Sequence, residues 1–229
     1  MANVKTTAMT IALTGMIAGS IASADSIDLT YTGIVGGNSA AQARIGSSTF
    51  RAGHMSHTIN SGAQAGQSFN TFCIEVEEYA NGGSSTYELV DLADAPDPGA
   101  DYGQAKADLV SSIIANAHAL GWIDAKMQAD SSDSLYLARM GAIQAAVWEA
   151  LGHDFQASSG STSSSLASQY AILMDSQTFD SSLRMRNLVA AVATGEQDML
   201  YIVPLPTSAM AGMGMLMGIA GVRTIRRRR

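Results

Sequence analysis

LYLARMGAIQAAVWEALG, residues 135–152, decides the expected fold, because a strong helical pattern here contains one misplaced polar residue. Apolar side chains recur every three or four residues, as on the buried face of an α-helix. They are Met140, Ile143, Val147 and Leu151. Gln144 lies within the same stripe, and a buried amide is costly unless it finds hydrogen-bond partners. The pattern predicts a helix that ends at Gly152 and carries one amide into the core.

Outward from this helix, the chain divides into strand-like and helix-like segments. Alternating apolar and polar residues predict a strand over 26–37. Similar stretches over 41–59 and 68–80, with β-branched and aromatic residues broken by Gly and Ser, predict further strands, and strands are also expected over 85–92 and 198–204. Helical periodicity extends over 103–121, 165–176 and 181–194. In the first of these helices the expected buried residues are Leu109, Val110, Ile113, Ile114, Ala117 and Leu120. We therefore expect one α+β domain over residues 25–202, with a β-rich body, sandwich or barrel-like, and an inserted helical region.

The N-terminal segment 1–24 has the layout of a secretory signal peptide. Lys5 precedes an uncharged run of small and apolar residues that closes on the A-x-A pattern Ala22-Ser23-Ala24. The run is too short and too rich in Gly, Ser and Thr to indicate a membrane span. We expect signal peptidase to remove this helix after Ala24, so that the body leaves the cytoplasm; the alternative is a buried N-terminal helix.

The C-terminal segment 203–229 has three parts in a fixed order. A proline motif comes first, an apolar stretch follows, and arginines close the chain. The motif is Val203, Pro204, Leu205 and Pro206, and the arginines are Arg223, Arg226, Arg227, Arg228 and Arg229. The apolar stretch is just long enough for a transmembrane helix, and the arginines would stay in the cytoplasm.

This tail resembles the PEP-CTERM protein-sorting signal in its VPLP variant, although Leu205 stands where the name-giving signal has glutamate. The resemblance implies a Gram-negative bacterium that secretes exopolysaccharide. It also implies an exosortase, a membrane transpeptidase that cuts near the proline motif and passes the protein to the cell surface or extracellular matrix. A permanent membrane anchor through the C-terminal helix is the alternative, and both interpretations place the body outside the cell.

The charge of the body excludes one class of partner. Between Asp25 and Val203 the chain has 20 acidic residues and seven basic ones, a formal charge of −13. A surface this acidic repels phosphates, so nucleic-acid binding is not expected.

Cys73, in TFCIEVEEY (71–79), is the only cysteine of the chain. Exported proteins usually use cysteines in pairs, as disulfides. A single cysteine can be a buried, inert thiol or one half of an intermolecular disulfide. A cysteine hydrolase or transamidase is a further alternative, in which Cys73 works with His118 or His153 and with Asp154.

Two short motifs together resemble the signatures of bacterial thioester domains, the TQXA type. The first is an aromatic residue or leucine, then cysteine, then an apolar residue: Phe72, Cys73 and Ile74. The second is apolar-Gln-x-Ala-apolar-Trp: Ile143, Gln144, Ala146, Val147 and Trp148. The resemblance spans roughly residues 26–203, but the motifs are its only sharp part. Family members associated with adhesion are mostly Gram-positive, so the sorting tail is a departure.

The resemblance implies an internal thioester between Cys73 and Gln144. The thiolate attacks the amide carbon, ammonia leaves, and the activated acyl group is stored in the fold until a nucleophile on a surface or matrix target, such as a lysine amine, attacks it. Holding the two groups together can remove about 7–11 kcal/mol of barrier in the best intramolecular cases. The motif's apolar residues, Phe72 and Trp148 among them, would exclude water. Such a protein acts once, so we do not expect an enzyme, and it needs no cofactor.

Other chemistry has weaker support in the sequence. His54 and His57 have a spacing that metal sites sometimes use, but no further ligands accompany them, and we expect surface histidines. Asp91, Asp94, Asp97 and Asp101 do not match the EF-hand calcium loop and are expected to form a solvated acidic loop. We therefore predict no metal site. A structural or polysaccharide-associated surface protein that binds without covalent chemistry remains the alternative function.

Overall fold

The computed structural model describes residues 26–97 and 100–204. The predicted signal peptide (1–24) and the part of the predicted sorting tail from residue 205 to 229 lie outside the described residues. Within the described ranges, no helix is both long and apolar enough to cross a membrane.

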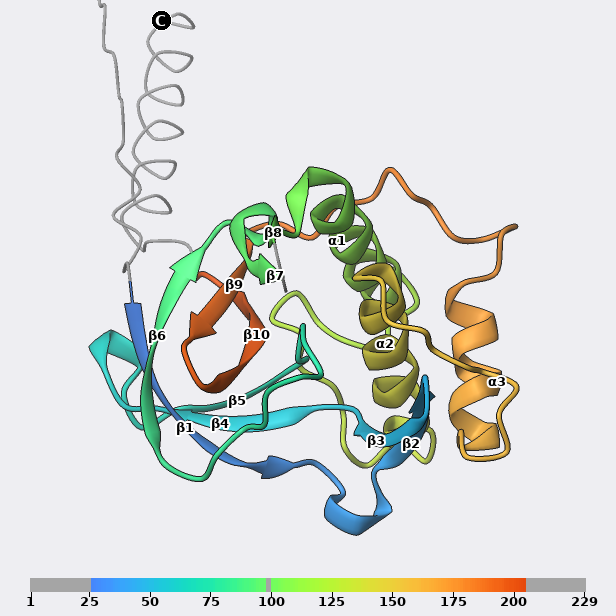
Figure 1. The fold of residues 1–229 in the computed structure, drawn as a ribbon, viewed down its shortest axis with the longest axis horizontal. Coiled ribbons are helices and arrows are strands. Elements are labelled where there is room, and N and C mark those ends of the chain that lie inside the picture. The colour runs from blue at the N-terminus through green and yellow to red at the C-terminus, as the bar shows by residue number, and fades with distance from the viewer. Residues whose placement is uncertain (1–25, 98–99, 205–229) are drawn as a thin grey trace, which may run out of the picture.

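The body is β-rich, and most of its strands belong to one antiparallel sheet. The sheet contains β1 (Ser26–Ile34), β4 (Met55–Ile59), β5 (Ser68–Thr71), β6 (Ser84–Val90), β9 (Leu188–Ala193) and β10 (Glu196–Ile202). Their order across the sheet is β10-β9-β6-β1-β4-β5. The sheet is strongly curled (Figure 1). One cluster of buried side chains comes from these strands alone: Ile27, Leu29, Ile59, Tyr87, Ala191, Met199 and Tyr201.

The two edge strands of the sheet meet just after β5. Cys73 forms an isolated antiparallel bridge with Met199 of β10. Leu200 donates its N–H to the Phe72 carbonyl (2.9 Å), and Ile74 donates to the Asp198 carbonyl (3.0 Å). The predicted strand over 68–80 therefore ends as a regular strand at Thr71, but residues 72–74 continue it as the seam that links β5 to β10. Cys73 lies at the middle of this seam.

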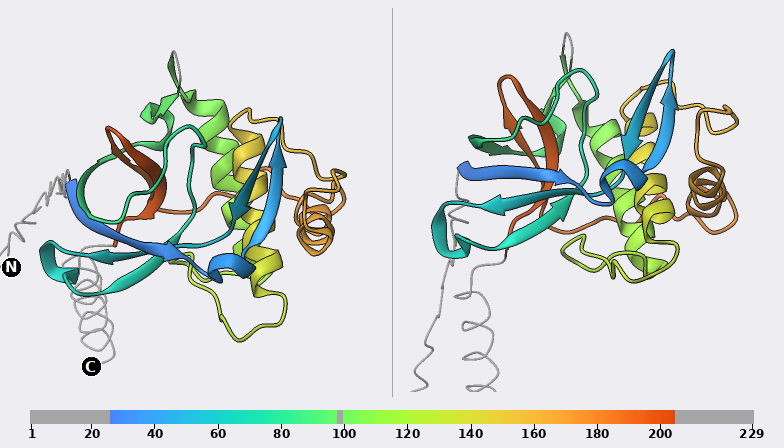
Figure 2. Two further views of the ribbon diagram at one scale, coloured as in Figure 1. Left: turned by 60° about the horizontal axis from the view of Figure 1, so that its bottom comes forward. Right: turned by 90° about the horizontal axis from the view of Figure 1, so that it is seen from below.

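In residues 26–97 and 100–204, the remaining elements are two hairpins and six helical segments. The hairpins are β2 (Ala41–Ile45) with β3 (Ser48–Ala52), and β7 (Pro96–Asp97) with β8 (Ala100–Asp101). The α-helices are α1 (Gly103–Ala119), α2 (Tyr136–Ala150) and α3 (Ser164–Leu173), and the short 3-10 helices are η1 (Gly37–Ser39), η2 (Gly62–Gln64) and η3 (Leu92–Asp94). The three α-helices follow β8, precede β9, and lie together beside the sheet (Figures 1 and 2). The predicted β-rich body with an inserted helical region is confirmed.

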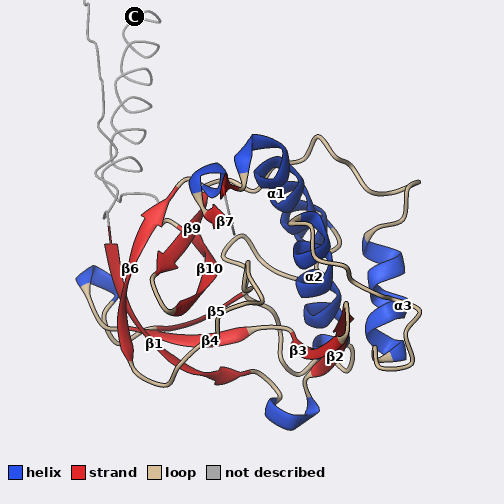
Figure 3. Cartoon of the chain, viewed as in Figure 1, coloured by secondary structure: helices blue, strands red, loops and turns tan. Residues whose placement is uncertain are grey.

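Helix α2 is buried on nearly every side, and not on one stripe as the periodicity predicted. Every residue from Met140 to Trp148 is buried. The helix lies between α1 and α3 and also packs against the β2–β3 hairpin (Figure 3). Gly141 shows why small residues are frequent here: a Cβ at this position would lie 2.7 Å from the Cβ of Ala41 and 2.9 Å from Cδ1 of Leu166. The alanine-rich sequence lets α2 pack closely against several neighbours at once.

Glycines end both long helices as predicted. Gly121 follows α1 with φ of +70°, and Gly152 follows α2 with φ of +104°. In each case the next residue, Trp122 or His153, donates to a carbonyl in the last helical turn, which is the Schellman arrangement. The predicted buried face of α1 was partly wrong. Leu109 and Leu120 are exposed, whereas Val110, Ile113, Ile114 and Ala117 are buried.

The predicted fourth helix over 181–194 was also wrong. Residues 181–187 form turns and coil, and Leu188–Ala193 is β9. Its run of valines and alanines meets a turn at Gly195 and then pairs with β10, so sheet pairing overrides the local helical pattern.

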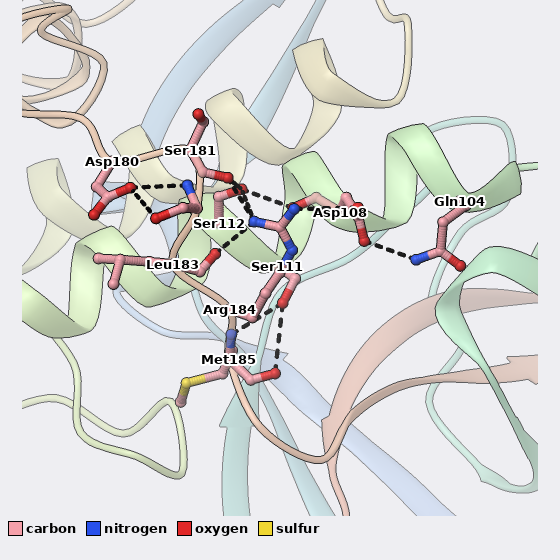
Figure 4. A network of polar contacts seen from close by, with 10 residues as sticks. Gln104, Asp108, Ser111, Ser112, Asp180, Ser181, Leu183, Arg184 and Met185 are labelled. Atoms are coloured by element: carbon pink, nitrogen blue, oxygen red, sulfur yellow. Dashed lines mark hydrogen bonds and ion pairs between the residues drawn. The ribbon is translucent and has the colours of Figure 1, made fainter.

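A polar network holds the segment before β9 against α1 (Figure 4). Arg184 donates to the carboxylate of Asp108 (3.1 Å) and to the hydroxyl of Ser112 (3.3 Å). The backbone N–H of Met185 donates to the hydroxyl of Ser111 (2.9 Å). These contacts fix the path of the segment that connects α3 to β9.

Candidate functional site

Cys73 and Gln144, 71 residues apart in the sequence, are in direct contact. The backbone N–H of Cys73 donates to Oε1 of Gln144 (2.9 Å). Nε2 of Gln144 donates to the carbonyl oxygen of Cys73 (2.7 Å). Both residues are only 1% exposed. The buried amide therefore has a partner at each end, and both partners belong to the cysteine.

Trp148 completes the contact from the same helix. Its indole N–H donates to Sγ of Cys73 (3.1 Å), and the thiol in turn donates to the carbonyl of Glu75 (2.6 Å). Positions four apart on an α-helix share one face. The Gln-x-x-x-Trp spacing therefore lets one helical face hold both the backbone and the sulfur of Cys73.

The other residues of the two motifs form the support behind this contact. Successive residues of an extended segment face opposite sides. Phe72 and Ile74 accordingly pack, with Ile143, Ala146 and Val147, into the core between the sheet and the helices. Cys73 and Trp148 belong to a different cluster, beside the β2–β3 hairpin. Among the described residues, Phe72 does not line the space next to the sulfur, so its predicted role in excluding water there falls to other side chains.

A pocket of about 650 Å³ lies over the Cys73–Gln144 contact. Cys73, Gln144 and Trp148 line it together with aromatic and polar residues from β1, β3, β10 and the segment after Cys73. These include Tyr31, Ser48, Thr49, Phe50, Arg51, Tyr79 and Gln197. Phe50 packs on the indole of Trp148, with ring centroids 6.1 Å apart. The pocket reaches the surface at Arg51 and Tyr79, which are both exposed. A small nucleophile could therefore reach an otherwise buried pair.

These pocket residues were not predicted from the sequence. In the sequence, Tyr31, Phe50 and Arg51 are distant from both motifs, and nothing in their local pattern distinguishes them from other strand residues. Tyr79 gave one weak signal, because it lies six residues after Cys73 in the sequence.

The surroundings of the sulfur keep the thiol protonated. Burial raises the pKa of Cys73 to about 12, and the hydrogen bonds from Trp148 and to the Glu75 backbone offset this only in part. Nearby carboxyl groups are affected as well. Burial raises the pKa of Glu75 to about 7 and that of Asp198 to about 6. Glu75 accepts the backbone N–H of Asp198 (3.0 Å), so the acidic pair lies directly behind the seam.

The predicted alternatives fare differently in the structure. Within the described residues the sulfur forms hydrogen bonds with an indole and a backbone carbonyl, whereas a hydrolytic cysteine needs a general base such as an imidazole beside it. His118 is exposed on α1, and His153 contacts Glu77 (3.9 Å). With 1% exposure, Cys73 is also poorly placed for an intermolecular disulfide.

The prediction of surface histidines was wrong. His54 is 1% exposed and His57 is fully buried. His54 precedes β4 and contacts the hydroxyl of Tyr136 through Nδ1 (2.8 Å), while His57 lies between the rings of Tyr31 and Phe69. Burial lowers the pKa of His54 to about 3 and that of His57 to about 4, so both rings are neutral. In the part of the chain that the structure describes, no group of three His, Cys, Asp or Glu residues could hold a metal ion.

We find no match to this chain among protein-family models, curated proteins or solved structures. The resemblance to thioester domains and to the PEP-CTERM signal therefore depends on the quoted residues.

Proposed function

We propose that Cys73 and Gln144 form an internal thioester, and that the protein uses it to attach covalently to a target. The observation that carries this proposal is the position of the Gln144 amide. It is hydrogen-bonded at both ends to the backbone of Cys73, beside a sulfur that Trp148 holds, at the floor of a pocket.

The hydrogen bonds suit the reaction that makes the bond. Sγ of Cys73 attacks the amide carbon of Gln144, the S–C bond forms, the C–N bond breaks, and the thiol proton leaves with the nitrogen as ammonia. Negative charge develops on Oε1 in the tetrahedral intermediate, and the N–H of Cys73 already points at that atom. One such preorganised donor contributes about 100- to 1,000-fold in rate in other acyl transfers. The Cys73 carbonyl orients the leaving nitrogen.

The buried site also favours storage of the product. A thioester carries no charge, so burial does not penalise it as it penalises a thiolate. Cys73 and Gln144 are each only 1% exposed, so little water reaches the acyl carbon, which slows hydrolysis. The thioester would therefore persist until a target enters the pocket.

The wider proposal is an exported bacterial attachment protein. Signal peptidase would remove residues 1–24, and an exosortase would process the tail at the proline motif. The protein would then pass from transient membrane anchoring to the cell surface or the extracellular matrix. The ends of the sequence support this part of the proposal, and the thioester does not depend on it.

Intact-mass measurement of the full-length protein tests the bond. The thioester form is lighter by one ammonia than the mass calculated from the sequence, and methylamine makes that form heavier by one methylamine. Cys73→Ser is the matched control and shows neither change. The alternative, a surface protein that binds without covalent chemistry and has an inert buried cysteine, predicts the calculated mass with and without methylamine.

A further inference from the structure

The pocket over Cys73 and Gln144 has a charge opposite to that of the body around it. Arg51 is the single charged side chain among the described residues that line it. The body as a whole has a formal charge of −13, and many of its carboxylates gather elsewhere. Glu75, Glu77, Glu78, Glu88 and Asp198 all line a separate depression of about 780 Å³. Among the described residues, Arg51 is thus the one charged side chain in the wall of the pocket, while Glu75 and Glu77 act electrostatically on the Cys73 sulfur without lining the pocket.

This charge disfavours a lysine as the incoming nucleophile. A lysine side chain arrives as an ammonium, finds no carboxylate among the described lining residues, and meets a guanidinium. Nη2 of Arg51 donates to Oδ1 of Asn38 (2.6 Å), and its other N–H groups remain to pair with an anion. Burial raises the pKa of Tyr31, while Arg51 lowers it in part and Cys73 raises it. Tyr31, Arg51 and Cys73 line the same pocket, so a ligand bound at Arg51 occupies the space that opens onto the sulfur.

The walls of the pocket suit a sugar. Four of the 14 aromatic residues in the chain line it, namely Tyr31, Phe50, Tyr79 and Trp148. Ser48, Thr49 and Gln197 supply polar groups between them. Small-molecule sites of about 300–1,000 Å³ commonly combine such apolar walls with a few polar groups that fix orientation. Aromatics make up only 6% of the chain, so their concentration at this one place is informative.

We infer that the pocket admits the hydroxyl group of an acidic sugar, and that capture forms an ester and not an amide. This inference rests on the proposed function. Arg51 pairs with the sugar carboxylate, and a hydroxyl oxygen attacks the acyl carbon of Gln144. The new C–O bond forms, the C–S bond breaks, and the hydroxyl proton passes to Sγ of Cys73, which leaves as a thiol. The target class is an acidic polysaccharide.

The test compares three probes on the full-length protein in its thioester form, each followed by intact mass. They are methyl α-D-glucuronide, methyl α-D-glucoside and Nα-acetyl-lysine N-methylamide, which carries no carboxylate, at equal concentration. We expect the glucuronide to add at least about five times faster than the other two, the range of a partly exposed charge pair. Hydroxylamine should remove the glucuronide adduct, because it cleaves esters. Arg51→Gln abolishes the preference for the glucuronide over the glucoside, and Arg186→Gln, the same charge change at an exposed site that is not among the pocket's lining residues, retains it.

Salt gives a second readout that needs no variant. If Arg51 recognises the carboxylate, the preference of the wild-type protein for the glucuronide falls as salt is added, because salt screens an exposed pair. Equal rates for the two glycosides, or a dominant lysine adduct, overturn the acidic-sugar inference while a methylamine adduct still supports the thioester. If the protein never shows the loss of ammonia, the proposed function fails first, and this inference fails with it.

Discussion

Methylamine should lower the thermal stability of this protein, because it would cut a covalent link between two distant segments. Cys73 and Gln144 are 71 residues apart, and a cross-link that closes a loop of this length stabilises a protein by about 4 kcal/mol through the lost entropy of the unfolded chain. For a body of this size, 1 kcal/mol corresponds to about 2–4 °C in the melting temperature. We therefore expect methylamine to lower the midpoint by roughly 10 °C.

The chemistry of the product makes this a measurement of the cross-link itself. Methylamine leaves an N-methyl amide on Gln144 whose carbonyl oxygen can still accept the N–H of Cys73. The hydrogen bond from Nε2 to the Cys73 carbonyl is absent from the thioester, because the nitrogen has left as ammonia, and the methyl group of a trans amide takes the place of that hydrogen in the product. The two forms therefore differ mainly in the cross-link. The assay is thermal denaturation followed by circular dichroism, with intact mass on the same samples. Cys73→Ser should melt at the lower temperature from the start and should not respond. A wild-type protein that gains one methylamine but melts at an unchanged temperature refutes the argument, because the bond would then not join these two segments.

Three further predictions concern the fold around the site. Gln144→Met is made in the Cys73→Ser background, which cannot form the cross-link. It keeps the length of the side chain but leaves the backbone N–H and C=O of residue 73 without the partners that Gln144 gives them. Chemical denaturation should show a loss of about 2–5 kcal/mol, well beyond that of Met→Leu at the buried Met140 in the same background. Gly141→Ala should lower the free energy of unfolding by about 1–2 kcal/mol despite the better helix propensity of alanine, because the new Cβ overlaps Ala41. Gly160→Ala is the control, because its new Cβ meets nothing within 4 Å. Equal effects at the two sites would contradict the close packing of α2. The pKa of Glu75 is raised to about 7, so between about pH 4.5 and pH 7 the folded state keeps a proton that the unfolded state has released. This group therefore makes stability fall as pH rises through that window. Glu75→Gln should make the melting temperature less dependent on pH over this range, and an unchanged slope would show that Glu75 does not titrate there.

Local patterns in the sequence predicted much of the secondary structure. The long helices end at Gly121 and Gly152, because a left-handed residue after a helix is a local requirement that glycine meets. Strand β1 follows local alternation, with Ile27 and Leu29 buried, whereas β10 is a mostly apolar strand that is buried from Asp198 to Tyr201. Local pattern failed where tertiary contacts chose between two permitted structures, as at Leu188–Ala193, which reads as a helix alone but pairs with β6 and β10.

For the candidate site, the sequence by itself determined the two residues and their chemistry: a lone cysteine, and a glutamine four residues before a tryptophan in an apolar helix. Only the tertiary structure decided that they meet. Their contact depends on where the edge strands β5 and β10 join, and on how α2 packs against that seam. The sequence also did not reveal that His54 and His57 are buried. Nor did it reveal which residues come together around the pocket: Tyr31, Phe50, Arg51 and Tyr79. Side-chain period reveals which residues share an element's face, but contacts between elements depend on packing over the whole chain.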